Sequence, residues 1–598
     1  MKSVLLILFA AVFAATAAVP RFSLAGGVYT NDITVGLTAS PQGAVIRLTT
    51  DGSDPTATSQ RYAAPLALTN SALIRARAFE GDAPSGAIVS ETYILLDPAI
   101  LDFKSELPLV VINTFGQRLS PKVKTPVSVR FIDRGSDGRA VLTGPADFEG
   151  RATLKIRGHS SLQFPKHSYS LKTRDESGQS LKAPILGFAS DSDWVLYAPY
   201  PDKTLMRDVL AYDLSRRMGH YAPRTRFVEV FATRSDRKLG MQSYVGVYVF
   251  EERIKRAHER VNIARLQPSD IAEPDISGGY IFKKDHEESP GGIRTSQGQH
   301  FYFVDPKERD LAPSQKTWLR RYLNRFEQAL YGPDFKDPAR GYAAYIEPES
   351  FIDYHWIVEV SKNIDGYRLS NYLHKDRNGK LKMEPIWDWN LSFGNANYME
   401  GWTPEGWYWP LVSQKDYLWF PRLFEDPDFN QKHIDRWAQL RTNELAVSNI
   451  LSRVDSFAMQ LREAQKRNFK RWRILNRPVW PNSYVGQSYA EEVDWMKQWI
   501  EERIAWIDQQ FPSAPTLSLN APTAPARRTA RLRAAKGEIY YTLDGTDPRA
   551  PGGSVSPKAR RYTEPVSLSA EIKLCARARS KSTWSAPLTF VKSETSPK

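Results

Sequence analysis

Two short stretches of similar sequence lie near opposite ends of the chain. Residues 47–57 read RLTTDGSDPTA, and residues 541–551 read YTLDGTDPRAP. Asp and Gly suit the positive-φ positions of a tight turn, and Pro interrupts a strand ladder, so each copy predicts a strand, a turn and a loop. An Arg-Tyr pair and an Ala-Arg-Ala triplet follow the first copy, and both recur 500 residues later. This repeat predicts two related small β-sandwiches, residues 19–97 and 513–598.

The segment between the repeats, residues 98–512, has a different pattern. Apolar strand candidates at residues 107–115 and 226–233 come first, and helical periodicity dominates after residue 350. A chain of 598 residues with 41% hydrophobic and 25% charged residues is typical of a globular protein with several domains. We therefore predict an α+β protein whose two-lobed core has a strand-rich lobe followed by a helix-rich lobe.

The amino terminus has the pattern of a secretory signal peptide, residues 1–18. A single Lys precedes an apolar run from Val4 to Phe13, and small residues suited to a signal peptidase follow. An uncleaved membrane anchor is the alternative, but this run is shorter than the ~20 apolar residues of a spanning helix. We expect a secreted, periplasmic or cell-surface protein with no transmembrane segment in its mature chain.

The cysteine count and the charge restrict the chemistry. Cys575 is the only cysteine, so no disulfide can form within one molecule, and its strand-like context favours a buried small hydrophobe over a nucleophile or metal ligand. A formal charge of +14 favours acidic partners such as phosphates. The Lys and Arg residues are scattered and form no helix-turn-helix or zinc-finger pattern, so we predict no nucleic-acid partner.

Residues 155–172, KIRGHSSLQFPKHSYSLK, place basic side chains around a turn of small residues. Arg157 ends a strand candidate, Ser160 and Ser161 lie in the turn, and Lys166 follows it. Backbone amides of such a turn can hold phosphate oxygens while Arg and Lys neutralise them. A surface hairpin with basic strands explains the pattern equally well.

Two other segments contribute charged candidates. Asp202 precedes a helical pattern that carries Arg207, so Asp202 is either a helix cap or catalytic, and Arg207 contacts either a phosphate or an acid. In GVYVFEERIKR, strand alternation places Glu251 and Glu252 on opposite faces, so one of them faces inward if the strand is half buried. A buried carboxylate needs a cation, for which Lys166 and a metal are the candidates.

The segment from residue 363 to 395 carries the most specific pattern. It supplies Asp365, then Asn371, then a KDRNGK hairpin turn, and then Asp388 and Asn390 between large aromatic residues. Carboxylate and amide oxygens on neighbouring strand or loop ends suit Mg²⁺ or Mn²⁺, whereas the nine histidines show no zinc-type spacing. Capping and turn formation explain each residue singly but not the alternation of polar and aromatic residues around Asp388.

These motifs together resemble the CotH kinase family, the spore-coat protein H group of atypical protein kinases. The resemblance rests on RGHSSLQFPKHSYSLK, DWVLYAPYPDKTLMRD, GVYVFEERI, NIDGYRLSNYLH and PIWDWNLSFG, in this order between residues 107 and 508. The two repeats resemble, more loosely, the small β-sandwich at the carboxyl end of chitobiases and hexosaminidases, through TTDGSDP and YTLDGTDP.

The resemblance implies an ATP-dependent phosphotransferase that acts on a protein hydroxyl. Phosphoryl transfer requires charge neutralisation and an acid that orients the attacking hydroxyl. By this resemblance Lys166 contacts nucleotide phosphates and pairs with Glu252, and Asp365 orients the hydroxyl. The other implied residues are phosphate ligands and metal ligands, namely Arg157, Ser160, Ser161 and Arg207 for the phosphates, and Asn371, Asp388 and Asn390 for Mg²⁺ or Mn²⁺.

One residue departs from the family pattern, because Asn390 stands where the family has a second Asp. A neutral amide can still ligate a metal, but the affinity should fall. An inactive kinase fold that serves as a surface scaffold or binding protein is therefore one alternative. A carbohydrate-active enzyme, with a carboxylate pair such as Glu251 and Glu252, is another, and the flanking domains are candidates to bind cell-surface carbohydrate.

Overall fold

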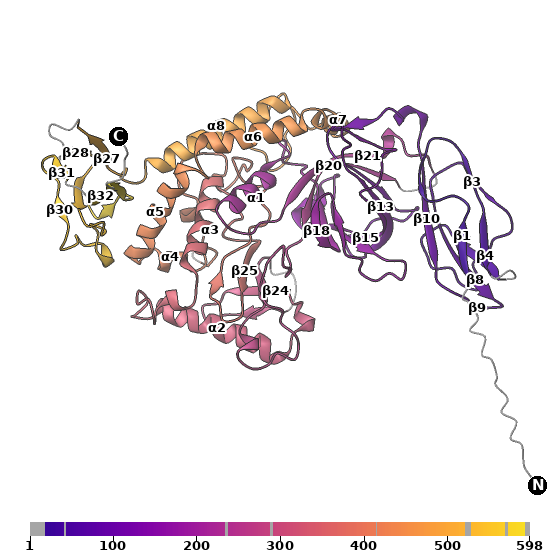
Figure 1. The fold of residues 1–598 in the computed structure, drawn as a ribbon, viewed down its shortest axis with the longest axis horizontal. Coiled ribbons are helices and arrows are strands. Elements are labelled where there is room, and N and C mark those ends of the chain that lie inside the picture. Colours follow the sequence, from indigo (N-terminus) through magenta and orange to yellow (C-terminus); the bar gives the residue numbers. More distant parts are fainter. Residues whose placement is uncertain are drawn as a thin grey trace, which may run out of the picture. The chain divides into compact units, whose positions relative to one another are not determined.

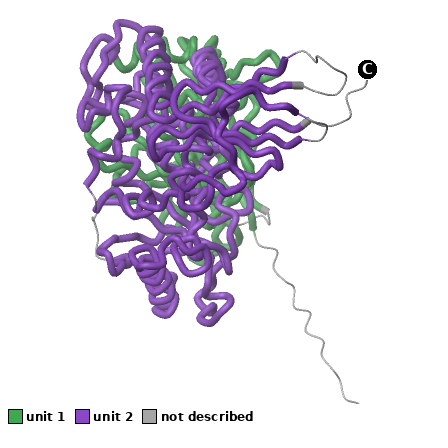
Figure 2. Tube along the Cα trace, turned by 90° about the vertical axis from the view of Figure 1, so that its left-hand side faces the viewer, with its two compact units in different colours: residues 1–198, 226–251, 460–472 green, residues 199–225, 252–459, 473–598 purple. Residues whose placement is uncertain are grey.

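The computed structural model describes residues 18–40, 44–233, 237–286, 291–413, 415–520, 528–568 and 572–592. The predicted signal peptide lies outside these residues except for its last position. The chain forms two compact units (Figure 2). Unit 1 comprises residues up to 198 together with 226–251 and 460–472, and unit 2 comprises residues 199–225, 252–459 and 473–598.

The amino-terminal repeat, in unit 1, folds as two facing antiparallel layers with one parallel strand added at an edge. One layer pairs β1 with β4 and β3 with β7, and the other has the order β2-β10-β8-β5-β6, with β9 paired to β8 (Figure 1). Apolar side chains of both layers, such as Val35 and Ile74, meet in one core. The strands are β1 Val19–Phe22, β2 Gly27–Tyr29, β3 Ile33–Val35, β4 Leu37–Ser40, β5 Val45–Thr49, β6 Gln60–Arg61, β7 Leu66–Leu68, β8 Ala72–Glu80, β9 Ala83–Pro84 and β10 Val89–Leu95.

In the carboxyl-terminal repeat, in unit 2, the larger layer pairs β30, β29, β32 and β34 in the order in which β6, β5, β8 and β10 pair in the first repeat. One layer is β27-β28-β31, and the other is β30-β29-β32 with β33 and β34 also paired to β32. As predicted from its strand-like context, Cys575 is buried in β32. The strands are β27 Thr516–Leu519, β28 Arg528–Arg533, β29 Glu538–Thr542, β30 Arg560–Arg561, β31 Val566–Leu568, β32 Ile572–Ser580, β33 Thr583–Trp584 and β34 Leu588–Lys592.

The repeated turn has the same hydrogen bonds in both copies. Asp51 accepts from the backbone N and the hydroxyl of Ser53, at 3.0 and 2.6 Å. Asp544 accepts from the same two groups of Thr546, at 3.0 and 2.5 Å. An aspartate that bonds the backbone two residues ahead is what makes Asp a turn residue, so the repeated DGSDP and DGTDP sequences reflect one shared corner.

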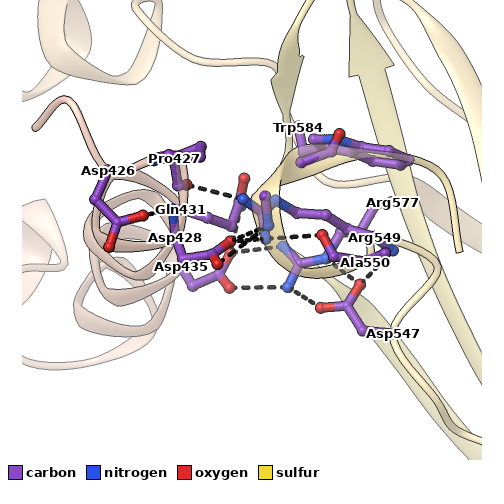
Figure 3. A network of polar contacts seen from close by, with 12 residues as sticks. Asp426, Pro427, Asp428, Gln431, Asp435, Asp547, Arg549, Ala550, Arg577 and Trp584 are labelled. Carbon is purple, nitrogen blue, oxygen red and sulfur yellow. Dashed lines mark hydrogen bonds and ion pairs between the residues drawn. The ribbon is translucent and has the colours of Figure 1, made fainter. Parts of the chain in front are cut away.

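The second Asp of each turn binds an arginine from the longest strand of its domain. Arg577 is 4% exposed and binds Asp547 on its own turn and Asp435 on helix α5 (Pro427–Thr442), with four nitrogen-to-oxygen distances of 2.6–2.8 Å (Figure 3). Within unit 1, Arg75 likewise binds Asp54 at 2.7 Å. The carboxyl-terminal domain is thus joined to helix α5 by charge-assisted hydrogen bonds of the buried Arg577.

The strand-rich lobe is a closed barrel in unit 1, in the order β12-β13-β15-β16-β19-β21-β20. The successive pairs from β12 to β19 are antiparallel, whereas β12 and β20 close the barrel as a parallel pair. Alternate residues of the strands fill the interior with aliphatic and aromatic side chains. The strands are β12 Leu109–Asn113, β13 Thr125–Ile132, β15 Phe148–Arg157, β16 Ser168–Arg174, β19 Asp193–Tyr197, β20 Thr225–Thr233 and β21 Tyr244–Glu252, with short pairs β11 Lys104–Ser105, β14 Ala140–Val141, β17 Ala183–Ile185 and β18 Phe188–Asp191.

One helix that comes much later in the chain belongs to the barrel. Helix α7 (Ala464–Arg471) lies within unit 1. Its Arg467 forms a two-point ion pair with Glu229 of β20, at 2.8 and 2.5 Å, and the Nε of Arg471 donates to the carbonyl of Tyr244 at 3.1 Å. These contacts fix the helix against the outside of the sheet.

The helix-rich lobe, in unit 2, surrounds helix α3, of which nearly every side chain is buried. A five-stranded sheet of order β23-β24-β22-β25-β26 completes this lobe. The α+β prediction is confirmed. The elements are α1 Arg207–Arg217, α2 Pro313–Tyr331, α3 Pro348–Ser361, α4 Phe420–Leu423, α6 Val447–Leu461, α8 Tyr489–Asp508, β22 Tyr280–Lys284, β23 Ile293–Arg294, β24 His300–Asp305, β25 Asn371–Lys375 and β26 Leu381–Lys382.

Across the described ranges, none of the helices combines the length and the apolar character that crossing a membrane requires.

Candidate active site

The basic turn predicted in the strand-rich lobe lies between two paired strands, β15 and β16. Arg157 ends β15 and faces Ser168 across the ladder, and Ser160 and Ser161 begin a short 3-10 helix. Gly158 has φ +123°, and a Cβ there would lie 1.9 Å from the hydroxyl of Ser161. Only glycine permits this close approach. The turn predicted from the Gly-His-Ser-Ser sequence is therefore present, and it requires Gly158.

Lys166 is buried, with 3% of its surface exposed. Its Nζ donates to the carbonyl of Val247 at 2.5 Å and to the Oδ1 of Asn468, on α7, at 3.0 Å. The ammonium also lies 5.0 Å from the ring centroid of Tyr248, within cation–π range. These contacts hold the side chain beside the middle of the barrel strand β21.

The structure gives Glu252 a different partner from the one we predicted. Arg224 donates to its carboxylate from Nε and Nη2, at 3.1 and 2.7 Å, and Arg260 lies 3.7 Å away. The prediction that Lys166 neutralises Glu252 is therefore wrong. Both Glu251 and Glu252 are buried, so β21 is not the half-exposed strand that the alternation argument assumed.

Asp202 and Arg207 form a buried pair that supports the start of helix α1. Asp202 accepts from the backbone N of Arg207 at 2.8 Å and from its Nη1 at 2.5 Å. The Nε of Arg207 also donates to the carbonyl of Ser392 at 3.1 Å. Arg207 is 1% exposed, and its guanidinium is used inside the protein, so our assignment of Arg207 to a phosphate is corrected to a structural role. Asp202 is not the N-cap residue, which is Met206, but its carboxylate accepts from the first backbone N of the helix.

Asp365 and Asp388 are brought together by one buried amide. Asn363 follows the end of helix α3 and is 1% exposed. Its Oδ1 accepts from the backbone N of Asp365 at 3.2 Å, and its Nδ2 donates to the carbonyl of Asp388 at 3.3 Å. The hairpin predicted at KDRNGK is present as the antiparallel pair β25 and β26, and the chain returns from it to Asp388. The two predicted carboxylates therefore share one local framework.

The backbone at Asp388 is held in an unusual conformation. Asp388 has φ +68°, which non-glycine residues adopt rarely and most often at functional sites. The hydroxyl of Tyr212 accepts from its backbone N at 3.1 Å, and Asp208 accepts from the backbone N of Trp389 at 2.5 Å. Both acceptors lie on helix α1. This helix and Asn363 therefore together fix the backbone position of Asp388, from which its exposed side chain extends.

The charges of Asp365 and Asp388 both act on the phenol of Tyr398. Burial raises the pKa of Tyr398, and the negative charges of Asp365 and Asp388 raise it further, to about 12, against the opposing effect of Arg368. Burial also raises the pKa of Asp365, which Arg368 lowers in part and Asp285 raises again. Asp365 is thus a carboxyl group in an environment that disfavours its charge, as expected for a group that takes up a proton.

Asn371 has an amide oxygen suited to a cation. Its Nδ2 contacts the carbonyls of Gly366 and Leu369, both at 2.7 Å, and the hydroxyl of Tyr354 at 3.0 Å. These contacts fix the orientation of the amide. The Oδ1 is buried and accepts no hydrogen bond within the described chain. Because a buried unpaired oxygen is costly, this atom fits a metal ligand.

Asn390 lies at the end of a chain of amides. The backbone carbonyl of Asn390 accepts from the Nδ2 of Asn395 at 2.9 Å, and the Oδ1 of Asn395 accepts from the Nδ2 of Asn482 at 2.7 Å. In the part of the chain that the structure describes, no three His, Cys, Asp or Glu side chains converge on a point that could hold a metal ion. A metal at this site would therefore depend on amide oxygens as well as on carboxylates.

Several residues around the site gave no signal in the sequence reading. Asn363 stands in a predicted motif, but its bridge between Asp365 and Asp388 depends on the fold. Tyr354 fixes Asn371 from the middle of helix α3, where its spacing looks like core. Asn468 lies 302 positions from Lys166, so no local pattern connects the two.

His220 is held between two carboxylates next to this framework. Its Nε2 lies 2.8 Å from Asp353, and its Nδ1 contacts Glu384. Arg436 also binds Asp353, and His374 and Lys382 lie 3.7 and 4.0 Å from Glu384. Burial alone would lower the pKa of His220, but the hydrogen bonds and charges of Asp353 and Glu384 raise it to about 9.

We predict that His220 makes the protein more stable at neutral than at alkaline pH. Because the folded-state pKa exceeds the unfolded value of about 6.5, its contribution is complete below pH 6.5 and is lost as the pH rises through 9. Melting temperatures of the wild type and His220→Gln, measured from pH 6 to pH 10, should differ most at the acid end. His258→Gln, at a side chain that is 85% exposed, is the matched control. A difference that does not change with pH would contradict the prediction.

The comparisons with known proteins agree with this architecture. The sequence model of the CotH kinase protein family matches residues 154–507, more than half of the chain. The chitobiase/beta-hexosaminidase C-terminal domain matches residues 24–90, and the domain described as Fn3 associated matches residues 531–590. A comparison with curated proteins found no match. The chain belongs to the CotH kinase family, and its core is flanked by two β-rich domains of the kinds that these matches describe.

Proposed function

We propose that this protein is an exported atypical protein kinase of the CotH type, which uses ATP and Mg²⁺ or Mn²⁺ to phosphorylate a protein hydroxyl. One observation carries the proposal. Asn363 joins the backbones of Asp365 and Asp388, and Asn371, which donates to the carbonyl of Gly366, has a buried amide oxygen that accepts no hydrogen bond among the described residues. Two carboxylates and an unsatisfied amide oxygen have the chemistry of a kinase metal site and its catalytic acid.

The roles follow from the chemistry of each group. Mg²⁺ or Mn²⁺ would be held by Asp388, Asn371 and Asn390, and would neutralise charge on the nucleotide phosphates. Within unit 1, Lys166, Arg157 and the turn at Ser160 and Ser161 have the positive charge and the donors that would hold nucleotide phosphates. Glu252 supports the same lobe through its arginine pairs.

Asp365 orients the acceptor hydroxyl and takes its proton as the phosphoryl group is transferred. A general base works best when its pKa lies near the working pH. The raised pKa of Asp365, caused first by burial, moves this carboxyl in that direction. Arg368, 3.8 Å away, favours the ionised form of Asp365 and so partly offsets the rise in its pKa.

The cellular setting is proposed from the ends of the chain. The signal-peptide pattern of residues 1–18 favours export, and the match of residues 24–90 to a domain of carbohydrate-acting enzymes supports a secreted or surface location. The acceptor on this view is a protein, and the flanking domains are candidates to bind cell-surface carbohydrate. An inactive kinase-fold scaffold is the second candidate, and Asn390 favours it because the amide replaces one anionic metal ligand.

The test is calorimetric titration of ATP in the presence of each metal. We expect Asp388→Ala to abolish metal-dependent ATP binding, because it removes the carboxylate from the proposed ligand set of Asp388, Asn371 and Asn390. Asn390→Asp should tighten metal binding, because it restores a negative charge at the site. Asp494→Ala, at an exposed position of helix α8, is the control for loss of an aspartate elsewhere. If Asp388→Ala binds ATP and metal as the wild type does, the kinase proposal fails and the scaffold candidate replaces it.

A further inference from the structure

Asn468 of helix α7 is the group through which a distant part of the chain reaches Lys166. Its side chain is 1% exposed. The Oδ1 accepts from the Nζ of Lys166 at 3.0 Å and from the backbone N of Val247 at 3.1 Å. One oxygen atom therefore ties the lysine to the barrel strand β21.

The backbone of Gly246 lies close to this contact. Gly246 has φ +108°, and a Cβ there would lie 2.6 Å from the Oδ1 of Asn468, 3.1 Å from the Nε1 of Trp472 and 3.4 Å from the Cε of Lys166. Trp472 itself donates to the carbonyl of Val245 at 2.9 Å. The missing side chain at Gly246 is what allows the helix, the strand and the lysine to meet.

The helix that carries Asn468 is held by charged contacts at several points. Arg467 binds Glu229 with two hydrogen bonds, and Glu463 binds Arg139. Both contacts precede Asn468 in the helix sequence, and Arg471, which donates to the carbonyl of Tyr244, follows it. A displacement of α7 would therefore withdraw the amide from Lys166, so the position of the lysine depends on the docking of this helix.

A neutral amide suits this task. A hydrogen bond to Asn468 restricts the direction of the ammonium group, and the amide brings no negative charge that competes with a phosphate for the same ammonium. A carboxylate in this place would hold the lysine more strongly and would also neutralise it.

We propose that Asn468 is a positioning residue that orients the ammonium group of Lys166 toward nucleotide phosphates. This inference rests on the proposed kinase function. Helix α7 thereby becomes part of the nucleotide-binding machinery, although its Asn468 lies 302 positions from Lys166 in the sequence. The family motifs that suggested Lys166 contain nothing of this helix.

The test is a double-mutant cycle on the full chain, with Lys166→Met, Asn468→Ala and the double variant. ATP affinity is measured calorimetrically with MgCl₂, and KM for ATP and kcat are measured with a generic acceptor. Because Asn468 acts through the lysine, Asn468→Ala should weaken ATP binding about tenfold in the wild type and not at all in Lys166→Met. KM should rise more than kcat falls. Lys470→Ala, an exposed residue of the same helix, should change neither.

Asn468→Asp keeps the oxygen that accepts both hydrogen bonds and the side-chain shape, so it tests the idea even if Asn468→Ala does not fold. It places a negative charge next to the Nζ of Lys166, and ATP binding should weaken because the carboxylate competes with phosphate. Equal effects of Asn468→Ala in both backgrounds, or unchanged ATP binding by Asn468→Asp, would overturn the inference alone. A wild type that binds no ATP would overturn the proposed function as well.

Discussion

Replacing Asp365 by Asn should leave ATP and metal binding unchanged but slow phosphoryl transfer by about 10²–10⁴-fold, the usual contribution of a positioned general base. Asn preserves the shape of the side chain but cannot take up the proton of the acceptor hydroxyl. The measurement is radiolabel transfer from ATP to a generic protein acceptor and to the protein itself, alongside calorimetric titration of ATP. Transfer at the wild-type rate by Asp365→Asn would remove Asp365 from the mechanism.

The pH dependence of transfer provides a separate check on Asp365. Because burial and Asp285 raise the pKa of Asp365, activity should fall with decreasing pH at a higher pH than an ordinary aspartate would give. Asp285→Asn removes one of the two causes, so this acid limb should move to lower pH while transfer itself persists. An acid limb that does not move would show that the charge of Asp285 is not felt at the catalytic carboxyl.

Replacing Arg503 by Met should destabilise unit 2 by about 3–5 kcal/mol, because it leaves a buried carboxylate without its cation. Arg503 and Glu359 both have side chains that are 0% exposed, and their charged atoms are 3.1 Å apart. Burial lowers the pKa of Arg503 to about 10, against the opposing effect of Glu359. The midpoint of urea unfolding, followed by tryptophan fluorescence, measures the loss.

Two variants separate the buried pair from a general effect of losing an arginine. Arg340 is 68% exposed and pairs with Asp334 and Asp337, so Arg340→Met should cost less than about 1 kcal/mol. The double variant Glu359→Gln with Arg503→Met should recover much of the lost stability, because no charge is then left buried. Equal losses for the single and double variants would indicate that packing, rather than charge, is responsible.

The local parts of this structure were predictable from the sequence. The two turns gave matching corners because Asp51 and Asp544 bond within their own turns, and the hairpin before Asp388 formed where KDRNGK indicated. Turns and hairpins of this kind depend on hydrogen bonds between residues a few positions apart, so a short stretch of sequence is enough to predict them. The grouping of Asp365 with Asp388 could be expected for the same reason, since one hairpin separates them.

The parts that could not be predicted depend on contacts between distant residues. Glu252 takes Arg224, which lies 28 positions earlier, because the fold places them together, whereas charge complementarity alone allowed Lys166. Arg207 looked equally suited to a phosphate or an acid until its burial against Asp202 decided the matter. The barrel closes through the parallel pairing of β12 with β20, and a parallel pairing over such a separation leaves no local signature.

The closed barrel also determines how this protein can be divided for expression. The family match begins at residue 154, inside β15, so a fragment cut at that limit loses β12, β13 and the first half of β15. The remaining strands β20 and β16 would then have unpaired edges, which are sites of aggregation. At the other end, a fragment that stops at residue 507 leaves Asp435 without Arg577. A soluble fragment should therefore begin before Leu109 and retain the carboxyl-terminal domain, so the stretch recognised as kinase is shorter than the unit that folds.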